Sequence, residues 1–306
     1  MMDKKHGMTD NFRGIAWMCL ASMLWALVEW IGHKVPTGHP ALQTVWVRYA
    51  VHLGLMVVVL GPRYGMVLVR TRRPVAQIFR SLLMLGMPVC FIAAIGRLDV
   101  NGIWLIFWVS PLLVLALSQV WLGERVGLHL WLAAGGGLAG VFLMLAGRGL
   151  SIFHWSVILP IGMAACFGVY LVMTRAMREE TTLANLFYTA LCVWLALTMM
   201  LPLFWRPLTW KAAQPMIAIG VIGFFLLLAI DRSLHLAPAA VVAPIMFTEV
   251  IWSILISGDG ALRFSAISVL AGAVLIVGSG LIIAAREVRS NPGFMAERKD
   301  GIDARD

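Results

Sequence analysis

Charged side chains are scarce in this 306-residue chain, at 13% of the residues, whereas hydrophobic residues make up 61%. A soluble globular chain carries about 25% charged and about 45–50% apolar residues. About half of the usual charge is therefore missing, which excludes a water-soluble enzyme of one or two domains. The 13 Trp and 14 Phe residues exclude a disordered chain, because such chains are poor in aromatic side chains. We therefore expect an integral membrane protein.

Sequence signatures of catalysis and of metal binding are missing as well. There is no H-E-x-x-H motif, nucleophile elbow or P-loop, and the 7 His residues are scattered without metal-ligand spacing. The 4 Cys residues lie far apart with no C-x-x-C, which is typical of small buried hydrophobes and not of a disulfide framework or a zinc site. We expect no catalytic residue, metal or cofactor, and no primary ATP-driven pump.

Ten apolar segments are present that approach the length of about 20 residues needed to cross a bilayer as a helix. They are 12–31, 41–60, 78–95, 100–122, 128–146, 152–173, 184–203, 214–230, 236–257 and 264–285. The connections are short, and the longest, 61–77, carries most of the charge in the middle of the chain. The fold class that follows is all-α and integral to the membrane, with ten transmembrane helices.

The positions of Lys and Arg predict the orientation, because cytoplasmic connections of membrane proteins are enriched in these residues. With the N-terminus inside, seventeen of the 24 cations lie on the cytoplasmic side, Arg48 lies within a span, and six lie on the outer side (Lys34, Arg97, Arg148, Arg206, Lys211 and Arg263). Both termini are then cytoplasmic. Because the positive charge is concentrated on one side of the membrane, we interpret it as a sign of membrane orientation. We expect the lipid bilayer, and no nucleic acid, as the partner of this protein.

The two halves share features at an offset of about 135 residues. These are Ala94-Ile95-Gly96-Arg97 and Ala229-Ile230-Asp231-Arg232, Pro111 and Pro244, Gly123-Glu124 and Gly258-Asp259, and Gly137 and Gly272. Four features in register indicate a five-helix unit used twice, and an odd number of helices means that the two copies are inverted. Inverted repeats with proline-broken helices are the architecture of secondary transporters. We divide the chain into a segment 1–12, repeats 13–146 and 152–285, and a polar cytoplasmic tail 286–306.

Two runs of residues carry a family resemblance. Ser110-Pro111 and Leu122-Gly123-Glu124-Arg125, before a glycine-rich helix, resemble the first repeat of the drug/metabolite transporter superfamily in its EamA-type branch. Ala240-Val241-Val242-Ala243-Pro244, followed by Phe247-Thr248-Glu249, is similar to the second repeat. The resemblance implies ten helices, with the fifth and tenth peripheral and the others around a central cavity. It also implies a bacterial inner-membrane carrier for a small metabolite.

Glu249 is the leading candidate for the transport chemistry. It lies inside segment 236–257 with no Lys or Arg within a helical turn, and Trp252 and Ser253 share its helix face. A charge at the bilayer centre costs roughly 2.5–3.5 kcal/mol on insertion scales, so this residue should face a cavity or a partner. Two readings stay open: a site for proton coupling or a substrate amine, and a protonated Glu bonded to a neighbouring helix.

Arg48 is the second ionisable residue predicted within the membrane. Thr44, Arg48 and His52 recur at intervals of four and form one polar stripe on an apolar helix. Since arginine keeps its charge in proteins, Arg48 needs a carboxylate or a wet cavity. It could pair with Glu249 or bind one end of a zwitterion, or it could be a packing arginine bonded to carbonyls. The resemblance favours a scaffold role, and His52 alone is typical of a hydrogen-bonded core histidine.

Aromatic side chains predict further lining of the cavity, namely Trp25, Trp108 and Tyr170, which would suit an aromatic or cationic substrate. Such residues are also ordinary packing surface. Glu29 shares a face with Trp25, but its place near the outer end predicts an interfacial role.

Four residues are expected to break helices or form gate contacts: Pro111 and Pro244 within spans, and Glu124 and Asp259 at helix ends. The carboxylates are poorly placed for a helix dipole at these ends, so we expect each to be paired.

The function predicted from these features is secondary active transport of a small metabolite by alternating access, with export of an amino acid as the first expectation and proton coupling as a hypothesis. Uptake of a vitamin or nucleoside-like compound is the alternative. A membrane-embedded enzyme or a non-transporting scaffold is the alternative of another class. The protein is expected to be a monomer or a homodimer.

Overall fold

The computed structural model describes residues 2–145, 155–257 and 266–289, and the regular elements in these ranges are all helices. They are α1 (Met2–Gly32), α2 (Ala41–Gly54), a π-helical stretch (Leu55–Leu60), α3 (Gly61–Tyr64), a 3₁₀ turn (Gly65–Leu68), α4 (Pro74–Ala94), α5 (Val100–Phe107), α6 (Ser110–Trp121), α7 (Leu128–Leu145), a 3₁₀ turn (Trp155–Val157), α8 (Ile158–Ala176), α9 (Thr182–Phe204), α10 (Trp210–Leu236), α11 (Ala239–Val242), a 3₁₀ turn (Ala243–Phe247), α12 (Thr248–Ser257) and α14 (Ala266–Arg289).

Eight stretches of the described chain are long and apolar enough to cross a membrane: Asp10–Gly32, Ala41–Leu68, Pro74–Ala94, Val100–Trp121, Trp155–Ala176, Thr182–Phe204, Trp210–Leu236 and Ala239–Ser257. Each coincides with one of the segments predicted from the sequence. The two remaining predictions, 128–146 and 264–285, fall on α7 and α14, whose apolar parts, Leu128–Met144 and Leu270–Arg286, are shorter. The all-helical prediction is therefore confirmed for the described residues.

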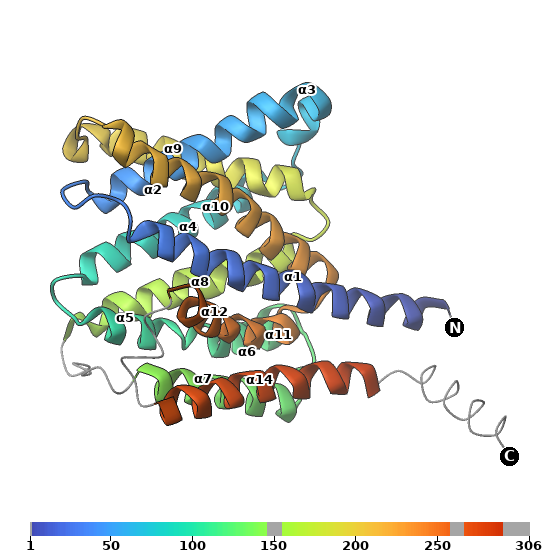
Figure 1. Cartoon of the computed structure of the whole chain (residues 1–306). Coiled ribbons are helices and arrows are strands. Elements are labelled where there is room, and N and C mark those ends of the chain that lie inside the picture. Colours follow the sequence, from blue (N-terminus) through green and yellow to red (C-terminus); the bar gives the residue numbers. More distant parts are fainter. Residues whose placement is uncertain (1, 146–154, 258–265, 290–306) are drawn as a thin grey trace, which may run out of the picture.

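Successive spans run back and forth between two ends of the bundle (Figure 1). The connections that follow α1, α4 and α9 lie at one end, which we call the outer end after the predicted orientation (Figure 1). The N-terminus, α3 and the last turns of α14 lie at the opposite, inner end (Figure 1). Local sequence fixes several helix starts: the carboxylate of Asp99 accepts hydrogen bonds from the backbone N–H groups of Asn101 and Gly102, and Thr181 caps α9 through Ala184.

The helices pack in a small number of pairs. α1 packs against α10 and α12, α4 against α8 and α9, and α2 against α9 and α10. α7 and α14 pack against each other along one edge of the bundle (Figure 1). At their contact an added Cβ at Gly140 would lie 2.7 Å from the Gly272 carbonyl oxygen, so only glycine allows this close approach.

Several boundaries differ from the sequence prediction, and two of them have an identifiable cause. α10 continues to Leu236, so Asp231 and Arg232 lie within it, whereas the predicted segment ended at residue 230. Charge alone suggested a loop there, but the buried Asp231 side chain is bonded to Asn185 of α9 and is therefore held inside the bundle. α4 begins at Pro74 and not at residue 78, because proline fits the first position of a helix.

Candidate functional site

A central cavity of about 170 Å³ lies between helices from both halves of the chain. α1, α2, α4, α5 and α8 contribute residues from the turns nearest the outer end, and α10 contributes from its middle and its inner half. The wall is mostly apolar and includes Trp25, Tyr49, Phe91, Trp104, Met84, Met87 and Met163. Two charged residues line it, Glu29 and Arg48. The cavity is about as large as the engineered apolar cavity of about 150 Å³ that holds benzene.

Arg48 reaches the cavity from α2, and the fold provides space for its side chain. An added Cβ at Gly223 of α10 would lie 2.7 Å from Arg48 Nε, and one at Gly220 would lie 2.6 Å from Val51 Cβ. The two glycines therefore bring α2 and α10 together and leave room for the guanidinium. Its Nε and Nη2 atoms are buried and have no hydrogen-bond partner among the described residues. The centre of the guanidinium lies 5.4 Å from the Tyr49 ring, within the range of a cation–π contact.

Glu29 lines the same cavity as Arg48 and carries the opposite charge, and its carboxylate interacts with other side chains. Trp25 Nε1 donates to Glu29 Oε1 at 3.0 Å across one helical turn. The side chain of Glu249 on α12 lies close enough to that of Glu29 for the two carboxyl groups to interact, although Glu249 Oε1 has no hydrogen-bond partner among the described residues. Two carboxyl groups can share a hydrogen bond only when one of them carries a proton, because an ionised carboxylate is an acceptor only. We call Glu29 and Glu249 the acid pair.

Glu249 is 4% exposed and lies beside a second space of about 10 Å³, roughly one water molecule in size. Trp25 borders both this space and the central cavity, and Trp108 borders the smaller one. The structure records no ion pair between Arg48 and Glu249 in the described part of the chain; the carboxyl group that interacts with Glu249 is that of Glu29.

The other predicted site residues lie away from the cavity wall. His52 is fully buried between Tyr49 and Phe224, and neither ring nitrogen has a hydrogen-bond partner in the residues the structure describes. Trp252 and Ser253 are half-buried on α12 and line neither space. Asp259 lies outside the described residues.

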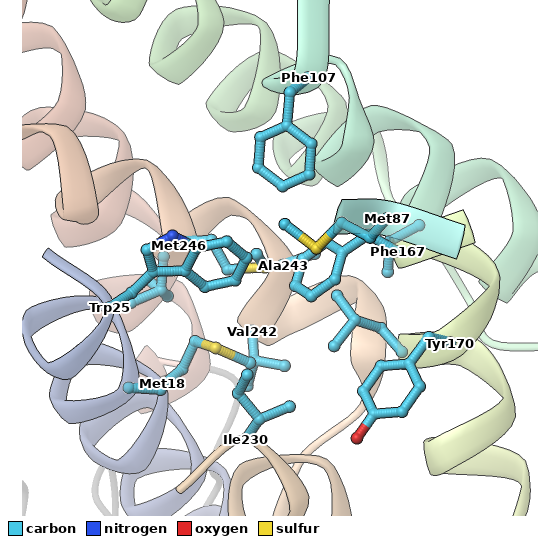
Figure 2. Packing of buried hydrophobic residues seen from close by; sticks show 14 of the residues in the cluster. Met18, Trp25, Met87, Phe107, Phe167, Tyr170, Ile230, Val242, Ala243 and Met246 are labelled. Atoms are coloured by element: carbon cyan, nitrogen blue, oxygen red, sulfur yellow. The ribbon is translucent and has the colours of Figure 1, made fainter. Parts of the chain in front are cut away.

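An aromatic layer lies on the inner side of the cavity. Phe107 is its centre, with ring centroids 5.9 Å from Trp25, 5.5 Å from Trp104 and 5.5 Å from Phe167. Figure 2 shows Trp25, Phe107, Phe167 and Met87 converging from different helices. Tyr170 stacks on Phe167 at 6.5 Å, on the side away from Trp25. The Tyr170 ring in turn lies 5.1 Å from the Arg80 guanidinium carbon, so the aromatic layer adjoins a polar one.

Arg80 is the centre of a buried polar network at the inner end. It is 1% exposed and donates to Thr174 Oγ1 at 3.1 Å, Gln77 Oε1 at 3.0 Å, the Asn185 carbonyl at 2.6 Å and Thr189 Oγ1 at 3.0 Å. This network joins α4, α8 and α9.

Asn185 extends the network to α10. Its side-chain oxygen accepts from Gln77 Nε2 at 2.7 Å, and its Nδ2 donates to Asp231 Oδ1 at 2.8 Å. Asp231 also pairs with His235 Nδ1 at 3.2 Å. A buried cation and a buried carboxylate are thus linked through Asn185, whose backbone carbonyl accepts from Arg80 and whose side-chain amide donates to Asp231.

Glu124 makes a second contact at the inner end. It accepts from Arg175 Nε at 3.3 Å and from the backbone N–H groups of Ala239 and Ala240, at the start of α11. Arg175 donates through Nη1 to the Leu234 carbonyl at the end of α10. The pair therefore fixes the α10–α11 connection to the inner ends of α6 and α8.

Prolines mark the breaks in two spans. Pro111 is in the first turn of α6, just after the break that separates α6 from α5. Pro244 lies in the 3₁₀ turn between α11 and α12.

Two parts of this arrangement were missed from the sequence. Glu29 was predicted to be interfacial, although its spacing of four from Trp25 was a usable signal, and the structure places it on the cavity wall. Arg80 was counted only as a cytoplasmic cation. The spacing of Gln77 and Arg80 on one helix face could have indicated a polar contact, but its partner Asn185 is more than a hundred residues away.

Comparisons with known proteins agree with this picture. The EamA-like transporter family matches residues 12–146, which confirms the resemblance to this branch of the drug/metabolite transporter superfamily. A riboflavin transporter of Rhizobium johnstonii (strain DSM 114642 / LMG 32736 / 3841) is 25% identical over 176 residues, which are 55% of this chain. The chain aligns with 57% of the length of that relative.

A solved crystal structure is similar in fold, with a TM-score of 0.77, 17% sequence identity, and coverage of 90% of this chain and 96% of that one. The family that matches the first half of the chain is one of transporters, and the apolar helices are consistent with a multi-pass membrane protein.

Proposed function

From a first half that matches the EamA-like transporter family, we propose that this protein is a secondary transporter that moves a small metabolite through its central cavity by alternating access. The observation that carries the proposal is the cavity itself: it lies between the two halves, with Arg48 and Glu29 on an otherwise mostly apolar wall. Substrate sites of transporters built from inverted repeats lie at the interface between the repeats.

The proposal includes ten membrane crossings, with α7 and α14 as the fifth and tenth, in two inverted repeats. The helix pairs support it. Exchanging the halves turns the pair α1–α10 into α8–α4, α2–α10 into α9–α4, and α1–α12 into α8–α6, and all of these pairs are in contact. The pairs α2–α9 and α7–α14 map onto themselves under this exchange, and the helices of both pairs are also in contact.

Alternating access follows from the unequal ends of the bundle. The cavity is lined mainly by outer turns, whereas the aromatic layer around Phe107 and the Arg80 network lie between it and the inner end. In the proposed cycle the cargo enters from the outer end or leaves to it in this conformation. The inner barrier opens when the contacts of Asn185 and Glu124 break.

Proton coupling is assigned to the acid pair of Glu29 and Glu249. We assign one shared proton to this pair, held mainly by Glu249, because this side chain is 4% exposed and Glu29 already accepts the Trp25 N–H. Arg48 is the nearby fixed cation on the same cavity wall, and His52 lies one turn from it. Loss of the proton leaves two neighbouring negative charges, so proton release is coupled to the arrival of a counter-charge or of water.

The proposed location is the inner membrane of a bacterium, with both termini in the cytoplasm, as the distribution of Lys and Arg predicts. Export of an amino acid or a related metabolite is the first candidate for the cargo. Uptake of a vitamin is the second candidate, and the 25% identity to a riboflavin transporter favours it.

The test of the cavity as the transport path is steric. Val45 lines the cavity, whereas Val58 in the same span is 73% exposed and faces away from the protein. In proteoliposomes loaded with a metabolite panel, Val45→Trp should abolish the flux seen with the wild type, and the matched Val58→Trp should keep it. Equal flux through Val45→Trp and the wild type would show that the cargo does not pass this cavity.

A further inference from the structure

The two charged groups on the cavity wall are unequally satisfied. Glu29 accepts the Trp25 N–H at 3.0 Å. Arg48 has no hydrogen bond or ion pair in the described ranges, and its Nε and Nη2 are buried without a partner. A buried donor to which nothing is bonded destabilises the fold, and more so when it belongs to a charged group. The group that Arg48 lacks is therefore an anion that accepts hydrogen bonds from its guanidinium.

The wall around Arg48 restricts the form of that anion. The guanidinium is backed by Gly223 of α10 and shares the cavity wall with the apolar side chains of Met84, Met87 and Phe91. A planar guanidinium matches a carboxylate, with two parallel N–H···O hydrogen bonds. One carboxylate also balances one arginine, whereas a phosphate monoester would bring about two negative charges into a cavity that already holds Glu29.

We propose that the cargo of this protein is a small monocarboxylate, whose carboxylate binds Arg48 and whose apolar or aromatic body lies against the methionines and aromatic rings of the cavity. The inference rests on the proposed transport function and names its substrate class. The body is small, because the cavity is about 170 Å³, near the size that holds one benzene ring. Carboxylate binding supplies the hydrogen bonds that Arg48 lacks, so the cargo stabilises the folded protein.

Arg48→Met tests the assignment without removing packing volume. The variant deletes a buried and unpartnered cation, so its thermal stability without cargo should equal or exceed that of the wild type. This result shows that the variant is folded. Arg48→Lys keeps the charge but loses the planar fork, and Arg70→Met removes an exposed arginine of the α2–α4 connection as the matched control.

The binding experiment uses monocarboxylates from acetate to phenylacetate, each paired with its uncharged amide, together with benzylamine as a cation. Phenylacetate should bind the purified wild type at least ten-fold more tightly than phenylacetamide or benzylamine. Arg48→Met should lose this preference, Arg48→Lys should retain a small part of it, and Arg70→Met should keep all of it.

The inference is wrong if no acid binds more tightly than its amide, or if Arg48→Met keeps the wild-type preference. Flux of a neutral or cationic cargo that Val45→Trp blocks would refute the substrate class and leave the transport function standing. Unchanged flux through Val45→Trp would instead refute the transport path, whatever the charge of the cargo.

Discussion

Asn185 is the residue whose removal should open the inner barrier most selectively. It is 1% exposed and makes two side-chain hydrogen bonds, with Gln77 at 2.7 Å and with Asp231 at 2.8 Å. Asn185→Ala leaves the Gln77 amide and the Asp231 carboxylate each short of one partner. A buried polar group left unsatisfied costs about 1–3 kcal/mol, and more when it is charged. The closed inner end should therefore lose at least about 2 kcal/mol, which is roughly thirty-fold in a conformational equilibrium.

Cys192 reports on this opening, because its side chain lies close enough to Ser81 and Arg80 to interact with both. In a background with the other three cysteines replaced by serine, a membrane-impermeant maleimide reaches Cys192 only through water. Asn185→Ala should raise its labelling rate from the inner side by about ten-fold or more.

The control is Thr198→Ala, which removes one hydrogen bond from Trp46 near the outer end of the same helix. Labelling of this variant should stay at the wild-type rate. Equal labelling of Asn185→Ala and the wild type would refute the account of the network as a barrier. An increase from the outer side alone would refute it too.

Two further predictions concern packing and pairing. Gly272→Val places side-chain atoms against the Gly140 carbonyl, so overpacking of about 1–3 kcal/mol should lower the apparent Tm in detergent. Gly278→Val on the same helix, where nothing lies within 4 Å of an added Cβ, should leave the Tm unchanged. Equal Tm values for the two variants would contradict the close α7–α14 contact. Glu124→Gln removes the charge that pairs with Arg175; the side chains of Arg175 and Glu124 are 10% and 13% exposed. The loss of this charge should lower the stability of the fold by about 1–3 kcal/mol, and with it the Tm. A Tm equal to that of the wild type would show that the pair does not stabilise this conformation.

Much of the fold could be predicted because each span is a continuous apolar run, and an apolar helix in a bilayer must satisfy its own backbone groups. The breaks at Pro111 and Pro244 followed from the chemistry of proline for the same local reason. The length of α10 could not be predicted locally, because Asp231 is retained inside the bundle by Asn185, which lies 46 residues away.

Only part of the candidate site could be identified from the sequence. Arg48 and Glu249 stood out because ionisable residues are rare within spans, but their partners depend on which helices meet. Glu29 comes to Glu249 only because α1 packs against α12. The space for Arg48 depends on Gly223, whose role cannot be told from that of the other 28 glycines without the α2–α10 contact.

Proton movement that accompanies cargo flux is the most direct test of the central claim, that the Glu29–Glu249 pair couples transport to protons. Proteoliposomes with a trapped pH-sensitive dye are given a gradient of the panel metabolite that the wild type moves fastest. The wild type and the exposed control Glu179→Gln should move protons with the cargo. Glu249→Gln should exchange the cargo without moving protons and should lose its pH dependence, since an amide cannot release the shared proton. Glu249→Gln that moves protons with the cargo at the wild-type ratio, or that keeps the full pH dependence of transport, would contradict the account.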